Sequence, residues 1–542
     1  MRFEDKRKNY SKQEIWEEYC GFLDLSLQDF MQIQHRLLQE QITLWSQSPL
    51  GKDILKGRII TSYEDFQRYV PLTSYEDYAD ALLMKDASVL PQDPVLWIQT
   101  TWEGGMHPIK VAPYTQSMLK NFKRNVLACL MLSTSTARGD FHIDKQDTIL
   151  YGLAPLPYAT GLVSLVFEQE TDIEFLPPVK EAVKLTFSQR NKLGFKLGIH
   201  KGIDYFFGLG SVTYYISKSL AAMSTGSGRS SHADIPLRRK LELLAAKHRC
   251  KKEGRTLQPK DLFTLKGFMV AGTDNALYKD DLEELWGIRP MEIFAGTEPT
   301  LIGTEIWSRD GLYFFPDACF YEFIPENEMM KNLDDPSYVP KTCTMEEVLP
   351  DHTYEIILSV LKGGAFMRYR VGDMYRCVSL SNREDGISLP RFRYLDRIPD
   401  VIDIGGFTRI TKNSIDSVIQ LSGLAIHRYI ARKELSSDNR PFLHLYIEMT
   451  KSAICYQAIT VEILRQHLSV YFKYVDQDYK DLKKILGIEP LQITILKTGT
   501  FAYYEEKSGK QLRTMNPTLY EVQDLLASQQ DSYPYEGGLR HE

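Results

Sequence analysis

The sequence has few cysteines, no long apolar run and no strong excess of charge of either sign. Its seven cysteines are scattered, odd in number and without a Cys-x-x-Cys pair, which excludes a disulfide framework or a cysteine zinc site and indicates a reduced, intracellular protein. The formal net charge of -6 provides no general attraction to nucleic acid or to an anionic membrane. We therefore expect neither as a partner.

The sequence also lacks the apolar segments that would place it in a membrane or direct it for export. Its most apolar stretch, residues 153–167, is short and interrupted by proline and glycine. The N-terminus is charged and does not resemble the apolar core of a signal peptide. These absences predict a cytoplasmic protein without a membrane span.

A Gly-x-x-x-x-Gly-Lys-[Ser/Thr] phosphate loop is absent as well. Residues 95–99 read as a strand and lead into residues 100–113, which contain paired glycines and Lys110. Glycines let backbone N–H groups approach a phosphate, and a lysine supplies positive charge. Because Trp102 and Met106 are bulky for such a loop, an ordinary surface turn is an equally good interpretation.

The composition is that of a large globular protein. With 542 residues, 43% of them hydrophobic and 25% charged, the chain is too long for one core, so we expect two or three domains. The pair Gly405-Gly406 is the best candidate boundary. We predict an N-terminal domain of residues 1–403 and a small α+β domain of residues 404–542.

The most informative stretch is residues 293–299, an apolar run that ends in Gly296-Thr297-Glu298. Apolar residues before it have helical spacing, and Arg289-Pro290 ends that helix. The apolar run that follows predicts a buried strand over residues 291–295. In open α/β sheets, ligands bind beyond the carboxyl ends of strands. There the threonine can bind a phosphate oxygen and the glutamate can hold Mg²⁺, although such a turn is more often only the end of a strand.

Two further stretches carry charged residues whose role the sequence leaves open. Asp373 follows a glycine at a predicted strand end, where a carboxylate can accept hydrogen bonds from both hydroxyls of a ribose or simply stabilise a turn. Residues 238–252 form a predicted basic helix. We interpret it as a solvated helix face, with nucleic-acid binding as the weaker alternative.

Four motifs in one order resemble the adenylate-forming superfamily, and more closely the Gretchen Hagen three family of acyl acid amido synthetases. They are the Gly/Lys loop before Lys110, the Thr-Glu turn, the Tyr-Arg-x-Gly-Asp stretch followed by Arg397, and the C-terminal Ser-Gly-Lys of Lys510. Residues 69–78, 320–325 and 499–501 carry the closer match. The resemblance covers nearly the whole chain.

This resemblance implies a fold of the α/β class, with a large N-terminal domain that binds ATP and an acyl acid and a small mobile α+β lid. It implies that a carboxylic acid is activated as acyl-AMP, with release of pyrophosphate, and then transferred to an amine such as an amino acid. The implied catalytic residues are Lys510 and Glu298, with Glu298 holding Mg²⁺. The residues implied to bind ATP are Thr100, Thr101, Gly104, Lys110, Phe294, Gly296, Thr297, Asp373 and Arg397.

The sequence departs from the family pattern in two places. The hydroxyl-rich loop expected before Lys110 is altered between Trp102 and His107, which leaves triphosphate binding open. Either Lys510 or Arg513 can supply the cation of the lid. We expect a monomer that acts on small molecules; an acyl-CoA synthetase and a nucleotide-binding protein without adenylation activity are the alternatives.

Overall fold

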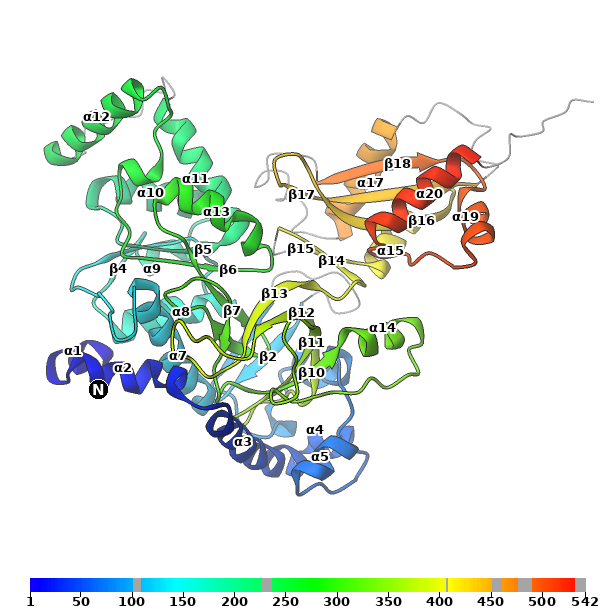
Figure 1. Cartoon of the computed structure of the whole chain (residues 1–542), viewed down its shortest axis with the longest axis horizontal. Coiled ribbons are helices and arrows are strands. Elements are labelled where there is room, and N and C mark those ends of the chain that lie inside the picture. The colour runs from blue at the N-terminus through cyan, green and yellow to red at the C-terminus, as the bar shows by residue number, and fades with distance from the viewer. Residues whose placement is uncertain (101–108, 226–235, 406–407, 451–460, 476–489, 532–542) are drawn as a thin grey trace, which may run out of the picture. The chain divides into compact units, whose positions relative to one another are not determined.

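The computed structural model describes residues 1–100, 109–225, 236–405, 408–450, 461–475 and 490–531. These residues form two compact units, of which the first extends to Asp396 and the second begins at Arg397 (Figure 1). The predicted division after residue 403 lies within strand β14 of the second unit.

The helices of the first unit are α1 (Phe3–Asn9), α2 (Lys12–Cys20), α3 (Leu27–Gln47), α4 (Pro49–Ile54), α5 (Tyr63–Tyr69), α6 (Ala79–Leu83), α7 (Gln116–Thr134), α8 (Ala159–Glu170), α9 (Val179–Ala182), α10 (Phe187–Lys201), α11 (Gly210–Thr225), α12 (Leu237–Lys252), α13 (Asn275–Trp286) and α14 (Glu326–Asp334). Its strands are β1 (Leu96–Gln99), β2 (Val111–Tyr114), β3 (Thr148–Tyr151), β4 (Glu174–Leu176), β5 (Tyr205–Leu209), β6 (Gly267–Ala271), β7 (Met291–Gly296), β8 (Thr300–Thr304), β9 (Tyr313–Phe314), β10 (Cys319–Pro325), β11 (Thr353–Val360), β12 (Tyr369–Ser379) and β13 (Arg391–Arg397), whose last residue opens the second unit.

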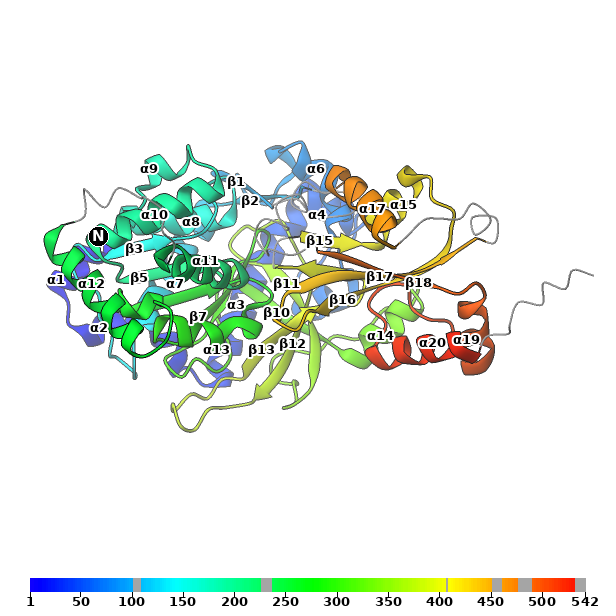
Figure 2. The ribbon, with the colours of Figure 1, turned by 90° about the horizontal axis from the view of Figure 1, so that it is seen from above.

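The main sheet of the first unit has seven strands in the order β4-β3-β5-β6-β7-β8-β9. The strands from β4 to β7 are parallel, whereas β8 and β9 continue the sheet antiparallel. Alternate residues of β5 face opposite sides: Phe206 packs on Phe195 of α10 and Trp286 of α13, while Tyr205 and Phe207 belong to the large core that also contains α7. Helices therefore cover both faces, as parallel strands require (Figures 1 and 2).

A second sheet, ordered β10-β11-β12-β13, packs against the long helix α3. This helix uses buried polar side chains as well as apolar ones. Gln41 donates to the carbonyl of Gly364 and accepts from the N–H of Gly363, both at 2.8 Å, and the indole of Trp45 donates to Ala365 at 2.9 Å. These contacts fix the loop that leads into β12, because a buried polar group without a partner is costly.

The segment before α6, residues 70–78, runs alongside the start of β12. Thr73 donates its N–H to Arg368 and accepts from the N–H of Arg370, each at 2.9 Å. The hydroxyl of Tyr78 donates to the carbonyl of Met367 at 3.1 Å and accepts from its N–H at 3.0 Å. Ser74 forms a capping box with Asp77 at the start of a short 3₁₀ turn, which precedes α6.

The second unit contains β14 (Val401–Ile404), β15 (Thr408–Thr411), α15 (Lys412–Ser422), β16 (Ile426–Leu435), β17 (Pro441–Met449), α17 (Val461–Val475), β18 (Leu491–Leu496), α19 (Thr500–Ser508) and α20 (Leu519–Asp531). Its main sheet, β16-β17-β18, combines one antiparallel and one parallel pairing. In the described parts of both units, no helix is long and apolar enough to cross a bilayer.

Removing the Tyr78 hydroxyl tests how much the 70–78 segment contributes to stability. In Tyr78→Phe the buried N–H of Met367 loses its acceptor, so we expect the free energy of unfolding to fall by about 1–3 kcal/mol. Urea denaturation measures this change. The control, Tyr10→Phe, removes an exposed hydroxyl and should leave the midpoint unchanged; an equal loss in both variants would contradict the assignment.

Candidate functional site

The Thr-Glu turn is the tip of a hairpin between β7 and β8. Gly296 pairs with Thr300, so Thr297, Glu298 and Pro299 form the connection. A Cβ on Gly296 would lie 2.8 Å from the ring of Pro299, which explains the glycine, and Thr300 adopts a φ of 69° to close the turn. The sequence predicted the strand end correctly but not the antiparallel return.

Glu298 is buried at this tip, with 5% of its surface exposed, and its carboxylate faces two side chains from other elements. The hydroxyl of Tyr369, at the start of β12, donates to Oε1 at 2.8 Å. The ammonium group of Lys110 lies 3.7 Å from the same oxygen. Among the described residues, none donates a hydrogen bond to Oε2, so the neighbouring side chains hold the carboxylate through Oε1.

Strand β2 holds both the turn and the lysine. The hydroxyl of Tyr114, at its end, donates to the carbonyl of Thr297 at 2.9 Å. Val111, at its start, exchanges hydrogen bonds with the hydroxyl of Tyr75, whose ring lies 5.6 Å from the Lys110 ammonium. Thr100 accepts from the N–H of Lys110 at 3.0 Å and thereby closes the β1–β2 hairpin. The 70–78 segment therefore contacts both neighbours of Glu298.

The sequence predicted Asp373 at a strand end. In the structure it lies inside β12. Arg370 pairs with Ile357 and Met374 pairs with Glu355, so three residues of β12 stand opposite the single residue Ile356 of β11. Gly372 has a φ of 80° within this bulge. A bulge redirects side chains and is common beside functional sites. It places the buried Asp373 carboxylate without ending the strand.

Phe294 lies in an aromatic cluster beneath the hairpin. Its ring stacks on Tyr394 at a centroid distance of 5.0 Å and meets the edge of Tyr375 at 5.4 Å. The ring is buried, so a role in shaping the wall of the site needs no hydroxyl.

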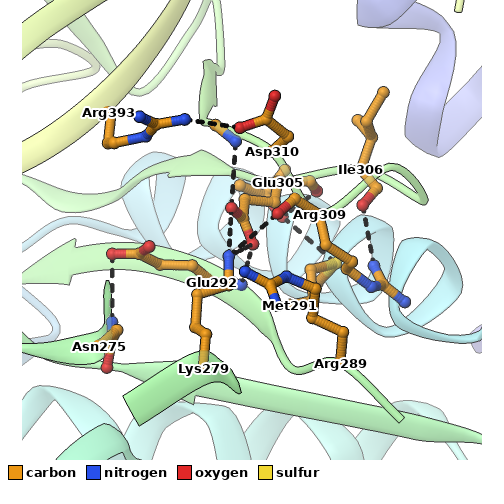
Figure 3. Close-up of polar contacts among 12 residues, drawn as sticks. Asn275, Lys279, Arg289, Met291, Glu292, Glu305, Ile306, Arg309, Asp310 and Arg393 are labelled. Atoms are coloured by element: carbon orange, nitrogen blue, oxygen red, sulfur yellow. Dashed lines mark hydrogen bonds and ion pairs between the residues drawn. The ribbon is translucent and has the colours of Figure 1, made fainter. Parts of the chain in front are cut away.

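The base of β7 carries a buried network of charges (Figure 3). Lys279 of α13 binds both carboxylate oxygens of Glu305, at 2.5 and 2.6 Å, and Glu305 also accepts from the N–H of Glu292. The Glu292 carboxyl accepts from the amide of Asn275 at 3.2 Å. Burial and the nearby charge of Glu305 raise the pKa of Glu292 to about 7, against the opposing effect of Lys279. This network joins α13, β7 and the segment after β8.

The remaining predicted site residues lie outside the described ranges or in the second unit. Thr101 and Gly104 lie outside the described residues. Arg397 is buried at the end of β13. Lys510 is exposed just after α19, which Gly509 caps with a φ of 65°. Arg397 and Lys510 belong to the second unit. Within the first unit, Lys110 contacts both Glu298 and Thr100.

Sequence reasoning missed the tyrosines that surround Glu298. Tyr369 is part of the Tyr-Arg-x-Gly-Asp motif but has no role assigned from the sequence, and Tyr75 lies in the 69–78 stretch. Tyrosine recurs in both stretches, and this recurrence is the signal that was present. Without a partner, however, a tyrosine in sequence is by default a core residue.

Family models match two regions of the chain that contain these residues. The GH3 family N-terminal domain matches residues 20–151, and the GH3 family central domain matches residues 312–397. These two regions of the chain are therefore similar to GH3 family domains. No curated protein sequence matches the chain.

Solved structures with the same fold cover most of this chain. The AtGH3.15 acyl acid amido synthetase in complex with 2,4-DB has 16% sequence identity and a TM-score of 0.53, over 96% of this chain and 97% of that one. A 2-hydroxyisobutyryl-CoA ligase in complex with 2-HIB-AMP and CoA has 15% identity and a TM-score of 0.57, over 87% and 86%. At these identities the similarity establishes the α/β fold of adenylate-forming enzymes.

The network at the base of β7 predicts a stability that depends on pH. Because the folded-state pKa of Glu292 is raised from 4.5 to about 7, stability falls as pH rises through this window and stays low above it. We expect Glu292→Gln, which keeps an acceptor for Asn275, to be more stable than the wild type above pH 7 by up to about 3 kcal/mol. The difference should shrink toward pH 4.5.

Denaturation curves from pH 4.5 to 8 measure this effect. The matched control is Glu284→Gln, on the exposed face of α13, which should leave the pH profile unchanged. A Glu292→Gln difference that is constant with pH would contradict the assignment.

Proposed function

We propose that this chain is an ATP-dependent acyl acid amido synthetase. The observation that carries the proposal is the Glu298 carboxylate, held by Tyr369 and Lys110 through Oε1, while no described residue donates to Oε2. The residues around it come from both matched GH3 domains, because Lys110 lies in one and Tyr369 in the other.

The proposed reaction has two steps. In the first, a carboxylate oxygen of the substrate attacks the α-phosphorus of ATP, and the bond to the bridging oxygen breaks to release pyrophosphate. In the second, the amine attacks the acyl carbon, the bond to AMP breaks, and the amine loses a proton. A carboxylate itself is a poor acyl donor because its leaving group is poor, and adenylation supplies a better one.

The residues of the first unit fit parts of the first step. Lys110 supplies positive charge beside the phosphates, Thr297 a hydroxyl at the hairpin tip, and Asp373 an acceptor for the ribose. Their contacts to ATP, and those of Thr100, Gly296 and Phe294, remain predictions, as do the roles of Arg397 and Lys510.

A magnesium ion fits the donors present. Magnesium that accompanies a nucleotide is usually held by one or two carboxylates and by the phosphates, and no described residue donates to Oε2 of Glu298. No cluster of three or more acidic, histidine or cysteine ligands occurs in the part of the chain that the structure describes. When bound, the ion would neutralise charge on the phosphates.

ATP–pyrophosphate exchange with Mg²⁺, across a panel of carboxylic acids, tests adenylation. We expect exchange that depends on one class of acid and falls by roughly a hundredfold or more in Glu298→Ala and Lys510→Ala. The exposed Glu346→Ala is the matched control and should retain activity. Exchange with no acid, together with calorimetric binding of AMP but not ATP, would contradict the synthetase and favour a nucleotide-binding protein.

The acceptor is identified in a second assay with the activated acid. Amide formation with an amino acid supports the amido synthetase. Thioester formation with coenzyme A, in place of an amide, would assign the chain to the acyl-CoA synthetases while leaving the first step unchanged.

Tyr369→Phe tests whether the tyrosine positions Glu298. Removal of the hydroxyl 2.8 Å from Oε1 should raise the Mg²⁺ concentration for half-maximal exchange by roughly tenfold, because partners of a metal ligand orient it. The measurement is a Mg²⁺ titration of the exchange rate alongside thermal denaturation. A lower melting temperature with an unchanged Mg²⁺ dependence would show a purely structural role.

A further inference from the structure

Helix α12 lies at the edge of the first unit in both views of the ribbon (Figures 1 and 2). Its inner face is built from Arg239, Leu243, Ala246 and Cys250, which recur at helical spacing. Ala246 and Cys250 are buried with Leu257, and the guanidinium of Arg239 donates to the carbonyl of Ile199 at 3.0 Å. The helix is therefore anchored along one side.

The outer face of α12 presents leucines to solvent. Leu237, Leu241 and Leu244 are 76%, 59% and 63% exposed and lie at spacings of four and three residues, so they form one stripe. Single exposed leucines are common on protein surfaces. Three on one stripe of one helix form an apolar ridge that the described residues leave exposed.

Basic residues flank this ridge. The helix contains seven basic residues and one acidic residue, Glu242, in a chain whose net charge is -6. Glu242 pairs with Arg238 and Arg239. Lys247, Lys251 and Lys252 pair with no acidic side chain of the described residues. The outer face therefore combines apolar surface with positive charge that the protein leaves uncompensated.

We propose that α12 docks the protein on an anionic lipid surface. A helix with leucines on one stripe and lysines beside it lies in the plane of a membrane interface, with the leucines among the acyl chains and the ammonium groups at the phosphates. The uncompensated lysines give charge complementarity with anionic headgroups.

Sedimentation of the full chain with vesicles tests this docking. Wild type should bind vesicles of phosphatidylcholine mixed with phosphatidylglycerol, should not bind phosphatidylcholine alone, and should be released by salt. The double variant Leu241→Ser, Leu244→Ser and the triple variant Lys247→Gln, Lys251→Gln, Lys252→Gln should each bind at least tenfold more weakly, because each loses part of the apolar or the electrostatic interaction with the membrane.

The matched control is Leu349→Ser, which alters a leucine of similar exposure elsewhere in the same unit and should bind like wild type. All variants should keep the wild-type melting temperature, since the altered side chains are exposed. Absence of binding to the anionic vesicles, or equal binding by wild type and both α12 variants, would overturn the proposal. Tighter capture on immobilised polyglutamate than on vesicles would assign the face to an acidic protein partner instead.

Discussion

The site depends on one buried carboxylate whose position is fixed from three directions. Glu298 stands on a hairpin tip that Gly296 and Pro299 make tight, and its Oε1 faces the Tyr369 hydroxyl and the Lys110 ammonium. A buried carboxylate is costly unless it is paired and hydrogen-bonded. The same contacts that offset this cost also orient its second oxygen, so stability and positioning have one physical origin.

The 70–78 segment has no obvious catalytic chemistry, but it supports the residues around Glu298. Thr73 and Tyr78 hold the chain immediately before and after Tyr369, and Tyr75 holds β2 beside Lys110. On either side of Tyr369, Arg368 and Arg370 each form two hydrogen bonds with a buried glutamate. Rigid support of this kind lets a site stabilise charge that develops during a reaction, because its groups need not reorganise.

The sequence was sufficient for the elements but not for the contacts between them. The apolar run to Ala295 and the break at Pro290 predicted β7, and the turn after it, because strand length and breakers are local signals. The bulge at Gly372 and the Tyr369–Glu298 contact depend on other segments of the chain, so no spacing within one stretch reports them. The antiparallel return of β8 is local, but its turn needs a positive φ at Thr300, which a threonine does not signal. The exposed leucine ridge of α12 is similar: its basic residues were evident, but its burial pattern depends on which face packs.

The most direct test of this account is a double-mutant cycle between Tyr369→Phe and Glu298→Gln, measured by acid-dependent ATP–pyrophosphate exchange. If the hydroxyl acts by positioning the carboxylate, the double variant should be as slow as Glu298→Gln alone, because the second change removes nothing further. If the two losses instead multiply as independent effects, Tyr369 does not act through Glu298, and the proposed organisation of the site is wrong.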